Sequence, residues 1–367
     1  MRIAHYTESL NEGGIASLLR GLAISQAMTD DVEICTIYNN HAIPTDIQSS
    51  SVKVHSLKKP STLLSYIYFP FVVYNNIRNS KSEIIHVHCS FVYYIIAIFL
   101  LHRKKHFFYT IHSDALKEKY SSRFEAITWC IKRLCFKKRW VLPITVSLQS
   151  EESFYRLYGF HAKIIINGIP LNIINESSIL KKYRNSSHTK LFVHAGRISE
   201  AKNQVAMCRA FEMILKDGID AHLIIAGSIQ DSAIFHKIES YLSDRITYLG
   251  HSDDVISMFH EADFMLLPSK WEGMPISMLE AMSQCCIPIC SPVGGIPSVV
   301  RHLDNGILLG DSSVDSIYRA LKIANSLSDE EMARLAHNGL KTIKEFSIEK
   351  TAQEYLKYYK TQDDTTS

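Results

Sequence analysis

The length and composition of the chain exclude several protein classes. Its 367 residues exceed what one hydrophobic core usually holds and suit two domains of roughly 150 to 200 residues each. Hydrophobic residues make up 46% and charged residues 21%, without a low-complexity tract or an internal repeat, which argues against disorder and against a solenoid. The composition is that of an ordinary globular protein.

The cysteines and the first residues indicate a reducing compartment. Most of the eight cysteines lie in apolar runs and none forms a C-x-x-C pair, so we expect buried, reduced thiols rather than a disulfide frame or a zinc site. The start, MRIAHYTES, lacks the apolar core of a signal peptide. We therefore expect a cytoplasmic protein.

Charge is unevenly distributed along the chain. Residues 1–170 hold 20 Lys and Arg against 12 Asp and Glu, whereas the remainder holds 20 against 25. Much of the basic excess lies in HRKKH (102–106) and KRLCFKKRW (132–140), near the apolar run FVYYIIAIFLL (91–101). This run is shorter than the roughly 20 residues of a membrane-spanning helix. It suits either a buried crossover helix with a solvated basic turn, or a helix resting on an anionic membrane surface.

Short β-branched runs alternate with helical patterns along most of the chain. Continuous apolar runs are typical of parallel strands covered on both faces, and the intervening lengths suit crossover helices. In the first part the runs are 2–7, 32–38, 83–89, 106–112, 141–147 and 162–169. After a polar stretch (175–190), further runs are 191–196, 221–227, 245–250, 263–269 and 286–291. The sequence thus predicts two doubly wound α/β domains.

Candidate ligand-binding residues follow several of these runs, because ligands bind beyond the carboxyl ends of parallel strands. Gly13 and Gly14 suit either a simple turn or a close approach to a phosphate or sugar. His112 ends its run, where an imidazole faces either the core or a ligand. Arg197 and Lys202, near the next helix start, form either a solvated pair or a diphosphate clamp.

Two carboxylates flank a predicted helix start in KWEGMPISMLEAMSQCCIPIC (270–290). Glu272 lies in the loop after a buried strand, and Glu280 lies about one and a half turns into the helix. Because a carboxylate accepts two hydroxyl hydrogen bonds, the two acids can hold a sugar on one side and a ribose on the other. That spacing suits a nucleotide-sugar.

The backbone between the two acids suits an anion. Pro275 is expected in the first turn of the helix. The free N–H groups of Met274, Ile276 and Ser277 would then face a phosphate, and Gly273 would permit its close approach.

The segment EGMPISMLE resembles the E-x7-E motif of retaining glycosyltransferases of family four. Further segments appear in that family's order and roughly its spacing: EGGIASLL, TIHSD, IINGIP, HAGRISEAKNQ, LIIAGS, YLGHSDDV, HEADFMLLPSKWEGMPISMLEAM and PVGGIP. The resemblance covers nearly the whole chain. It implies the GT-B fold, an α/β architecture of two facing Rossmann-like doubly wound domains with a cleft between them.

The resemblance implies catalytic and donor-binding roles for the charged candidates. Glu272 would contact the donor hexose, and His112 would lie near the anomeric centre. Glu280 would hold the ribose hydroxyls. Arg197 and Lys202 would bind the diphosphate.

Backbone segments complete the donor site that the resemblance implies. Gly13 and Gly14 would approach the phosphates from the first domain. The turn Gly273, Met274, Pro275 and Ile276 would bind the phosphates from the second domain. The nucleobase would lie against Leu249 and Gly250.

The chain departs from the family pattern at a few positions. Ala16 and Ser17 stand where the family often has Glu and then His, so acceptor contacts there stay open. Cys285 replaces a common Gly, and Ser298 replaces a frequent Glu. Neither is a core donor contact in the family.

No metal or other cofactor is expected, because the nucleotide-sugar is a substrate and no D-x-D motif is present. Asp253 and Asp254 are adjacent and are interpreted as a helix cap. The family retains anomeric configuration, and front-face departure and attack is the mechanism it suggests.

We expect a hexosyltransferase that uses a UDP-sugar in preference to GDP-mannose and acts on a saccharide or lipid-linked saccharide in surface polysaccharide synthesis. The expected parts are an acceptor domain (1–170), a donor domain (171–345) and a C-terminal helix and tail that pack on the first domain (346–367). Nucleic acid is not an expected partner, whereas peripheral contact with an anionic membrane is. An inactive nucleotide-sugar-binding subunit and a nucleotide-sugar 2-epimerase stay open as alternatives.

Overall fold

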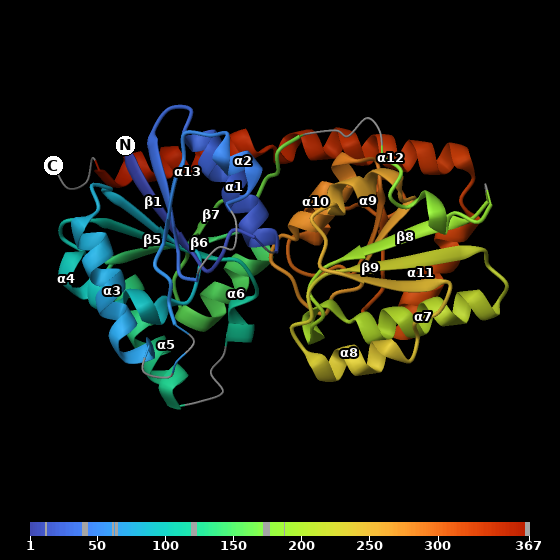
Figure 1. The fold of residues 1–367 in the computed structure, drawn as a ribbon, viewed down its shortest axis with the longest axis horizontal. Helices are drawn as coiled ribbons and strands as arrows, with labels where there is room; N and C mark the ends of the chain where they lie inside the picture. The colour runs from blue at the N-terminus through green and yellow to red at the C-terminus, as the bar shows by residue number, and fades with distance from the viewer. Residues whose placement is uncertain are drawn as a thin grey trace. The chain divides into compact units, whose positions relative to one another are not determined.

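The computed structural model describes the whole chain except residues 12, 39–42, 61, 63–64, 119–122, 172–176, 187 and 364–367. The chain divides into two compact units, each built around one sheet (Figure 1). The first unit comprises Met1–Pro170 with Ile348–Ser367, and the second comprises Leu171–Ser347. Glu12 of EGGIASLL, parts of the polar stretch at 175–190 and the end of the C-terminal tail lie outside the described residues.

The first unit has a parallel sheet with the strand order β3-β2-β1-β4-β5-β6-β7. Its strands are β1 (Arg2–Thr7), β2 (Asp31–Thr36), β3 (Lys53–Ser56), β4 (Ile84–Val87), β5 (His106–Ile111), β6 (Val141–Thr145) and β7 (Lys163–Ile164). The order reverses between β1 and β4, where His5 pairs with His86. Doubly wound sheets bind ligands at the carboxyl ends of strands at such a switch point.

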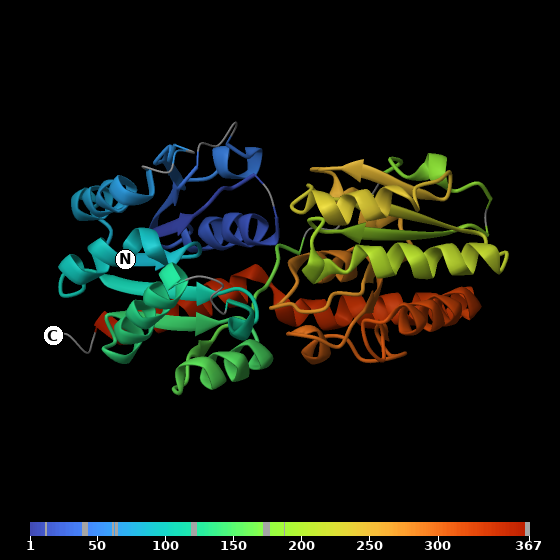
Figure 2. The same ribbon diagram turned by 90° about the horizontal axis from the view of Figure 1, so that it is seen from below.

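Helices cover both faces of this sheet (Figure 2). Side chains of α3 to α6 share one core cluster with Tyr6 and Ile85, whereas α1 and α13 pack against each other. Because neighbouring strand residues point to opposite faces, His5 and His86 lie on the other face, where His86 contacts Tyr359 of α13. The helices are α1 (Gly14–Gln26), α2 (Thr45–Gln48), α3 (Ser65–Asn79), η1 (Phe91–Tyr94), α4 (Ile95–Leu101), η2 (Ala115–Glu118), α5 (Arg123–Lys137), α6 (Leu148–Tyr158) and α13 (Ile348–Asp363).

The second unit repeats this architecture with the parallel order β10-β9-β8-β11-β12-β13, which reverses between β8 and β11. Figure 1 shows α7, α8 and α11 on one face of the sheet and α9, α10 and α12 on the other. The strands are β8 (Lys190–Ala195), β9 (Ala221–Ala226), β10 (Ile246–Gly250), β11 (Phe264–Leu267), β12 (Ile287–Cys290) and β13 (Ile307–Leu308). The helices are η3 (Lys181–Tyr183), η4 (Glu200–Lys202), α7 (Gln204–Lys216), α8 (Ser232–Glu239), α9 (Val255–Glu261), α10 (Ile276–Ser283), η5 (Ile296–Ser298), α11 (Val314–Ser326), α12 (Asp329–Ile343) and η6 (Lys344–Phe346).

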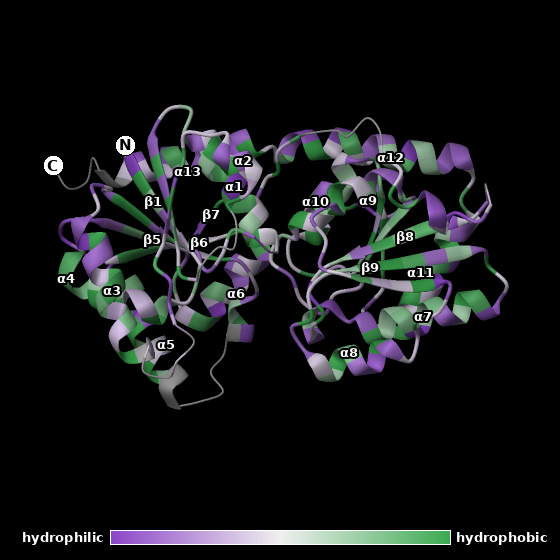
Figure 3. Cartoon of the chain, viewed as in Figure 1, coloured by the Kyte–Doolittle hydropathy of each residue, from purple (hydrophilic) through white to green (hydrophobic). Residues whose placement is uncertain are grey.

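The central strands are apolar because helices cover both of their faces. Every residue of β9 and β11 is buried, and Figure 3 shows hydrophobic colour along β8 and β9. Each of the predicted apolar runs contains a strand, which confirms two doubly wound α/β domains. The prediction omitted two strands, β3 and β13. The first has no buried residue, and the second has only two residues.

The apolar run 91–101 forms η1 followed by the short helix α4. Ala97, Ile98 and Leu101 are buried, whereas Phe99 and Leu100 are exposed. Among the described residues, no helix has both the length and the apolar character needed to cross a bilayer.

Candidate active site

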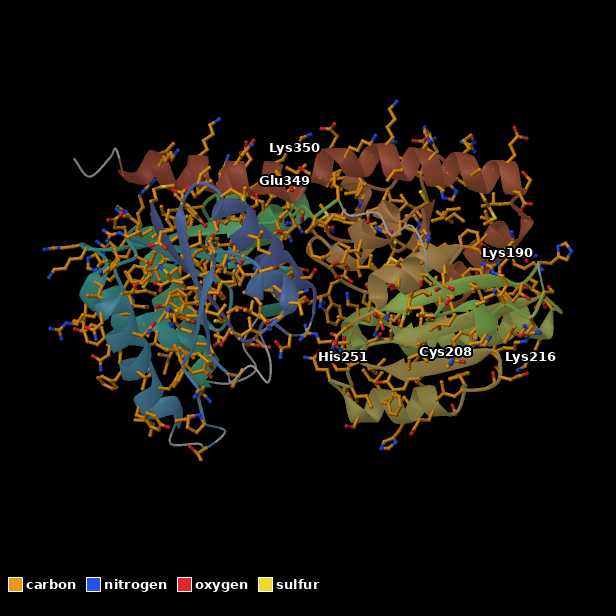
Figure 4. All side chains as sticks on the ribbon, turned by 45° about the horizontal axis from the view of Figure 1, so that its top comes forward. Lys190, Cys208, Lys216, His251, Glu349 and Lys350 are labelled. Atoms are coloured by element: carbon orange, nitrogen blue, oxygen red, sulfur yellow. The ribbon has the colours of Figure 1, made fainter. Side chains whose placement is uncertain are left out.

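The carboxyl ends of the second unit's strands gather at one end of that unit. Figure 4 shows His251, which directly follows β10, at the opposite end of the unit from Lys190, the first residue of β8. Residues that follow β8 and β11 therefore lie at the switch point of this sheet, where a ligand is expected.

Glu272, in the loop after β11, is held by two side chains. Lys202 Nζ lies 2.7 Å from Glu272 Oε1, and Ser269 Oγ donates a hydrogen bond to the same oxygen at 2.6 Å. The Lys202 and Glu272 side chains are only 20% and 10% exposed, so water screens this ion pair less than a surface pair. No described residue donates a hydrogen bond to Glu272 Oε2. Lys202, predicted to bind the diphosphate, and Glu272, predicted to contact the hexose, thus form one ion pair.

The loops after β8 and β11 are tied together next to this pair. Asn203 adopts a left-handed backbone conformation with φ 59°, which asparagine tolerates better than most residues. Its Nδ2 donates to the carbonyl oxygens of Pro268 at 3.1 Å and Ser312 at 2.7 Å. The Lys270 N–H also donates to the Ala201 carbonyl at 2.8 Å. These bonds place Lys202 beside Glu272.

Two glycines after β12 support the turn that carries Glu272. Gly294 has φ +60°, and a Cβ there would lie 2.5 Å from the Glu272 carbonyl oxygen. The Gly295 N–H donates to the Gly273 carbonyl, and a Cβ on Gly295 would lie 2.5 Å from Met274 Cε. Any other residue at Gly294 would displace the backbone of the Glu272 loop, whereas one at Gly295 would require the flexible end of Met274 to move.

The helix between the two acids is α10. Pro275 is its N-cap rather than part of its first turn, which corrects the sequence prediction by one residue. Among the described residues, no hydrogen bond from the N–H groups of Met274, Ile276 and Ser277 is found, as expected at a helix start. Glu280 is half-buried in the body of α10.

Arg197, which follows β8, is exposed and makes no ion pair with any described residue. Its carbonyl accepts a hydrogen bond from Gln204 Nε2 at 2.9 Å. The same amide lies 3.2 Å from His194 Nε2, while His194 Nδ1 donates to the Leu266 carbonyl at 2.8 Å. Burial lowers the pKa of His194 to about 4, so this histidine is neutral and structural. Gln204 thus fixes the backbone of Arg197.

The predicted nucleobase segment lies at the end of β10. Gly250 has φ +75°, and its carbonyl accepts a hydrogen bond from the Gly227 N–H at 2.7 Å. A Cβ on Gly227 would lie 2.1 Å from the Gly196 carbonyl oxygen, so the loops after β8 and β9 touch. Leu249 and Gly250 are half-buried beside this contact. Their strand end therefore adjoins the loop that leads to Arg197.

Five residues that hold the loops of this site lie in the segments that resemble the family, but the sequence predicted no role for them. They are Asn203, Gln204, Gly227, Ser269 and Gly294. The glycines in LIIAGS and PVGGIP were visible as sequence signals for tight turns. The contacts of the other three residues depend on tertiary structure.

Asp254 occupies the N-cap position of α9, in agreement with the predicted cap. Its side chain makes no capping hydrogen bond. Asp253 lies 3.4 Å from His251 Nε2.

The first unit presents two predicted elements at its switch-point edge. Gly13 is the N-cap of α1 with φ +86°, and Gly14 is the first helical residue. His112 follows β5, and its Nε2 lies 3.1 Å from His88 Nδ1. Burial lowers the pKa of His112 to about 4, so its imidazole is neutral near pH 7.

A group of buried histidines lies behind His112. Single ring nitrogens of His5, His86 and His88 lie within 4.8 Å of one another, which is close enough for a shared metal ion. His86 Nε2 is 2.7 Å from Thr110 Oγ1, and His86 Nδ1 bonds the Tyr359 hydroxyl. Hydrogen bonds to protein groups thus already occupy both nitrogens of His86.

Comparison with known proteins supports the family resemblance. Residues 175–342 match the model of the family described as Glycosyl transferases group 1. N-acetyl-alpha-D-glucosaminyl L-malate synthase from Bacillus anthracis is 30% identical over 50% of this chain and 48% of its own length. UDP-Gal:alpha-D-GlcNAc-diphosphoundecaprenol alpha-1,3-galactosyltransferase from Escherichia coli is 26% identical over 58% of this chain and 55% of its own length.

Other relatives and solved structures match over nearly the whole chain. The capsular polysaccharide biosynthesis glycosyltransferase CapH of Staphylococcus aureus is 22% identical over 98% of both chains. Sucrose-phosphate synthase from Thermosynechococcus elongatus superimposes with a TM-score of 0.81 at 18% identity, covering 99% of both chains. Anabaena HepE, in complex with UDP and glucose, gives 0.81 at 19% identity over 98% of this chain and 100% of its own.

The comparisons differ in how much of each relative they cover. The chain spans about half the length of the first two curated relatives, whereas the fold matches extend over both units. The family match covers much of the second unit, which carries Glu272 and Lys202. Residues 175–342, less than half of the chain, match the glycosyl transferases group 1 model, and the solved structures confirm the expected GT-B fold of two doubly wound domains.

Proposed function

We propose that this chain is a retaining glycosyltransferase of family four, which moves a hexose-type sugar from a nucleotide-sugar to a saccharide or lipid-linked saccharide. The observation that carries the proposal is the Glu272–Lys202 pair at the switch point of the second sheet. Lys202 and Ser269 hold one carboxylate oxygen, and the other accepts a hydroxyl hydrogen bond from the donor hexose.

The diphosphate of the donor binds next to this pair. Arg197 is exposed and makes no ion pair with a described residue, so its guanidinium supplies a fork of donors for phosphate oxygens. The N–H groups at the start of α10 add the positive end of a helix dipole. Both stabilise the negative charge that grows on the leaving diphosphate, without a metal ion. Glu280, farther along α10, holds the ribose hydroxyls.

A uridine nucleotide is the favoured donor. The E. coli relative is named for UDP-Gal, and the HepE structure contains UDP and glucose. For this chain the same donor class follows from the proposal, with the base against Leu249 and Gly250 at the end of β10. GDP-mannose is the less favoured donor.

Retention of configuration is proposed to occur by front-face substitution. The bond between the anomeric carbon and the phosphate oxygen breaks, and the bond to the acceptor oxygen forms on the same face. The acceptor proton passes to an oxygen of the leaving phosphate. Glu272 acts by holding a hydroxyl of the hexose, because Lys202 and Ser269 fix its other oxygen.

The acceptor is proposed to be lipid-linked, which would bring the first unit to the cytoplasmic face of an anionic membrane. The neighbouring helices α3 and α4 expose Ile67 (70%), Phe71 (54%) and Leu100 (61%). The exposed bases Arg103 and Lys104 follow α4. Exposed apolar side chains with adjacent bases are typical of peripheral membrane contact.

Only part of the basic surface is available for such contact. Lys105 Nζ donates to the carbonyl oxygens of Ser80 at 2.8 Å and Ser82 at 2.6 Å, so this lysine is engaged within the unit. Lys137 and Lys138, at the end of α5, are exposed. These two lysines supplement Arg103 and Lys104.

Two experiments test the proposal. A thermal-shift panel of UDP-, GDP- and ADP-sugars identifies the donor, because a ligand that binds the folded protein raises its melting temperature. Release of free sugar from that donor then separates a transferase from an inactive binding subunit. We expect a shift with a UDP-sugar and slow hydrolysis of it. Binding without hydrolysis would favour the inactive subunit, and conversion of the donor to its 2-epimer would favour the epimerase.

A further inference from the structure

A continuous chain of hydrogen bonds runs beneath the carboxyl ends of β1, β4 and β5 in the first unit. Gln26 Oε1 lies 2.7 Å from His5 Nε2, His5 Nδ1 lies 3.1 Å from His88 Nε2, and His88 Nδ1 lies 3.1 Å from His112 Nε2. We term this chain the histidine relay (Gln26, His5, His88 and His112). Gln26 and His5 are fully buried, and His88 is 5% exposed.

The direction of every hydrogen bond in the relay follows from its first member. A neutral imidazole has one N–H donor and one acceptor nitrogen, and the Gln26 oxygen can only accept. His5 therefore donates from Nε2, which leaves its Nδ1 to accept from His88 Nε2. His88 Nδ1 must then accept from His112 Nε2.

The relay leaves one lone pair at its end. With its proton on Nε2, His112 has an unprotonated Nδ1 atom. This Nδ1 atom is buried and has no hydrogen-bond partner among the described residues. An acceptor nitrogen in that state suits a hydroxyl group, which donates one hydrogen bond.

Burial keeps the whole relay uncharged. It lowers the pKa of His5 and of His112 to about 4, and lowers that of His88 well below its ordinary value. Near pH 7 each ring is therefore neutral and carries its proton on either Nδ1 or Nε2. In many proteins such a choice is set by the partner of the other ring nitrogen.

We propose that Gln26, through the two buried histidines, fixes His112 as the Nε2–H tautomer, so that Nδ1 accepts a hydrogen bond from a sugar hydroxyl. Gln26, His5 and His88 are then positioning residues, because they act through His112 and not on the substrate. The identity of the substrate rests on the proposed function, whereas the tautomer does not.

A metal ion at His5, His86 and His88 is the competing explanation for this cluster. Its ring nitrogens are close enough, but each coordinating nitrogen would lose its present hydrogen bond, which for His86 is the bond to either Thr110 or Tyr359. A metal on His88 Nδ1 would break the bond to His112, and a metal on His88 Nε2 would leave Nδ1 protonated and so reverse that bond. The two explanations therefore predict different states of the His112 ring.

The test is a long-range proton–nitrogen NMR spectrum of the free protein with ¹⁵N-labelled histidine, near pH 7. The His112 signals are assigned by their loss in His112→Gln. We expect a protonated Nε2 and an unprotonated Nδ1, in spectra that are the same with EDTA and with added zinc. A proton on Nδ1, or a zinc-induced change at His88, would overturn the relay. Once His112 is assigned, the wild-type spectrum decides the direction of the relay, even where Gln26→Leu fails to fold.

Two variants separate the relay from general packing. Gln26→Leu removes the acceptor that sets the direction, so His112 should become a mixture of tautomers. Thr110→Val, on β5 and equally buried, removes a partner of His86 but leaves every bond of the relay in place. We expect a wild-type His112 spectrum in this control. An unchanged tautomer in folded Gln26→Leu would contradict the role of Gln26.

An activity measurement connects the relay to the proposed function. With UDP-glucose as the probe, Gln26→Leu should lower kcat for donor hydrolysis roughly tenfold, with KM changed less, because the acceptor nitrogen is no longer held in place. If the wild type shows the expected tautomer but hydrolyses no nucleotide-sugar, the proposed function fails and the relay stands. Wild-type kcat in Gln26→Leu would sink the positioning role.

Discussion

The two units use the same topology to present different chemistry at their switch points. In the second unit, the loops after β8 and β11 bring together an ion pair, Lys202 with Glu272, beside the exposed Arg197. In the first unit, the corresponding edge between β1 and β4 holds neutral, hydrogen-bonded histidines that end at His112. One edge presents a buried ion pair, and the other presents a chain of neutral histidines.

This difference fits a division of work within the proposed reaction. A diphosphate leaving group gains negative charge, so cations and helix N–H groups belong where it departs. A neutral imidazole places a hydrogen-bond acceptor near a sugar without adding a charge that would attract or repel the phosphates. Substitutions at each edge separate the two halves of this division.

The largest effect is expected at Glu272. Glu272→Gln keeps the size of the side chain but removes its charge, and turnover of the donor should fall by at least about 100-fold. Affinity for free UDP should stay equal or rise, because Lys202 loses its partner and becomes available to phosphate. Kinetics and calorimetry on the same protein measure both effects.

Glu200→Gln is the matched control for that change. Glu200 forms an exposed ion pair with Lys270 at 3.2 Å, in the same two loops as the Lys202 pair. Exposed pairs contribute little, so wild-type turnover is expected. Equal losses in both variants would show that general loop stability, and not the carboxylate of Glu272, controls turnover.

Nucleotide binding should depend on Arg197 and Glu280. Truncating either residue to alanine should weaken UDP binding by roughly 1.5 to 3 kcal/mol, the scale of a hydrogen bond to a charged group. Arg197→Ala should weaken binding of pyrophosphate as well, whereas Glu280→Ala should not, because its proposed partner is ribose. Titration calorimetry with both ligands decides between the roles, and unchanged UDP affinity in either variant would refute the role of that residue.

Membrane contact should be weaker and sensitive to salt. Each base near an anionic surface contributes about 1 kcal/mol, so Lys137→Glu with Lys138→Glu should reduce sedimentation with anionic vesicles severalfold at low salt. Lys163→Glu is the control, because this exposed lysine lies on β7, away from α4 and α5. Equal sedimentation with neutral and anionic vesicles, or none with either, would refute peripheral contact with an anionic membrane.

No effect at all is expected from EDTA on donor hydrolysis. The proposed site neutralises phosphate with Arg197 and the N–H groups at the start of α10, so it requires no divalent ion. Assays with EDTA and with added magnesium or manganese should give equal rates. Loss of activity with EDTA that either metal restores would overturn the metal-free mechanism.

The sequence predicted the fold well because continuous apolar runs indicate strands that are buried on both faces. The edge strand β3 was missed because its four residues alternate between exposed and half-buried positions. The two residues of β13 are too few for a pattern. Periodicity therefore reveals the centre of a sheet better than its edges.

The sequence suggests candidate residues for the site but not how their side chains pair. Glu272 and Lys202 were both named, yet nothing in the sequence shows that residues 70 positions apart form an ion pair. The relay was hidden for a different reason. His5 and His88 occur within apolar runs, where a histidine has the appearance of a core residue. Only the tertiary contact with Gln26 determines which ring nitrogens of these histidines donate and which accept hydrogen bonds.

The most direct test of the central claim is the configuration of the sugar that the protein releases from an α-linked UDP-hexose. Proton NMR distinguishes the two anomers before they interconvert, and wild type and Glu272→Gln are compared at equal concentration. We expect the wild type to release the α anomer first and Glu272→Gln to release almost none. Early release of the β anomer, or equal release by the two proteins, would contradict it.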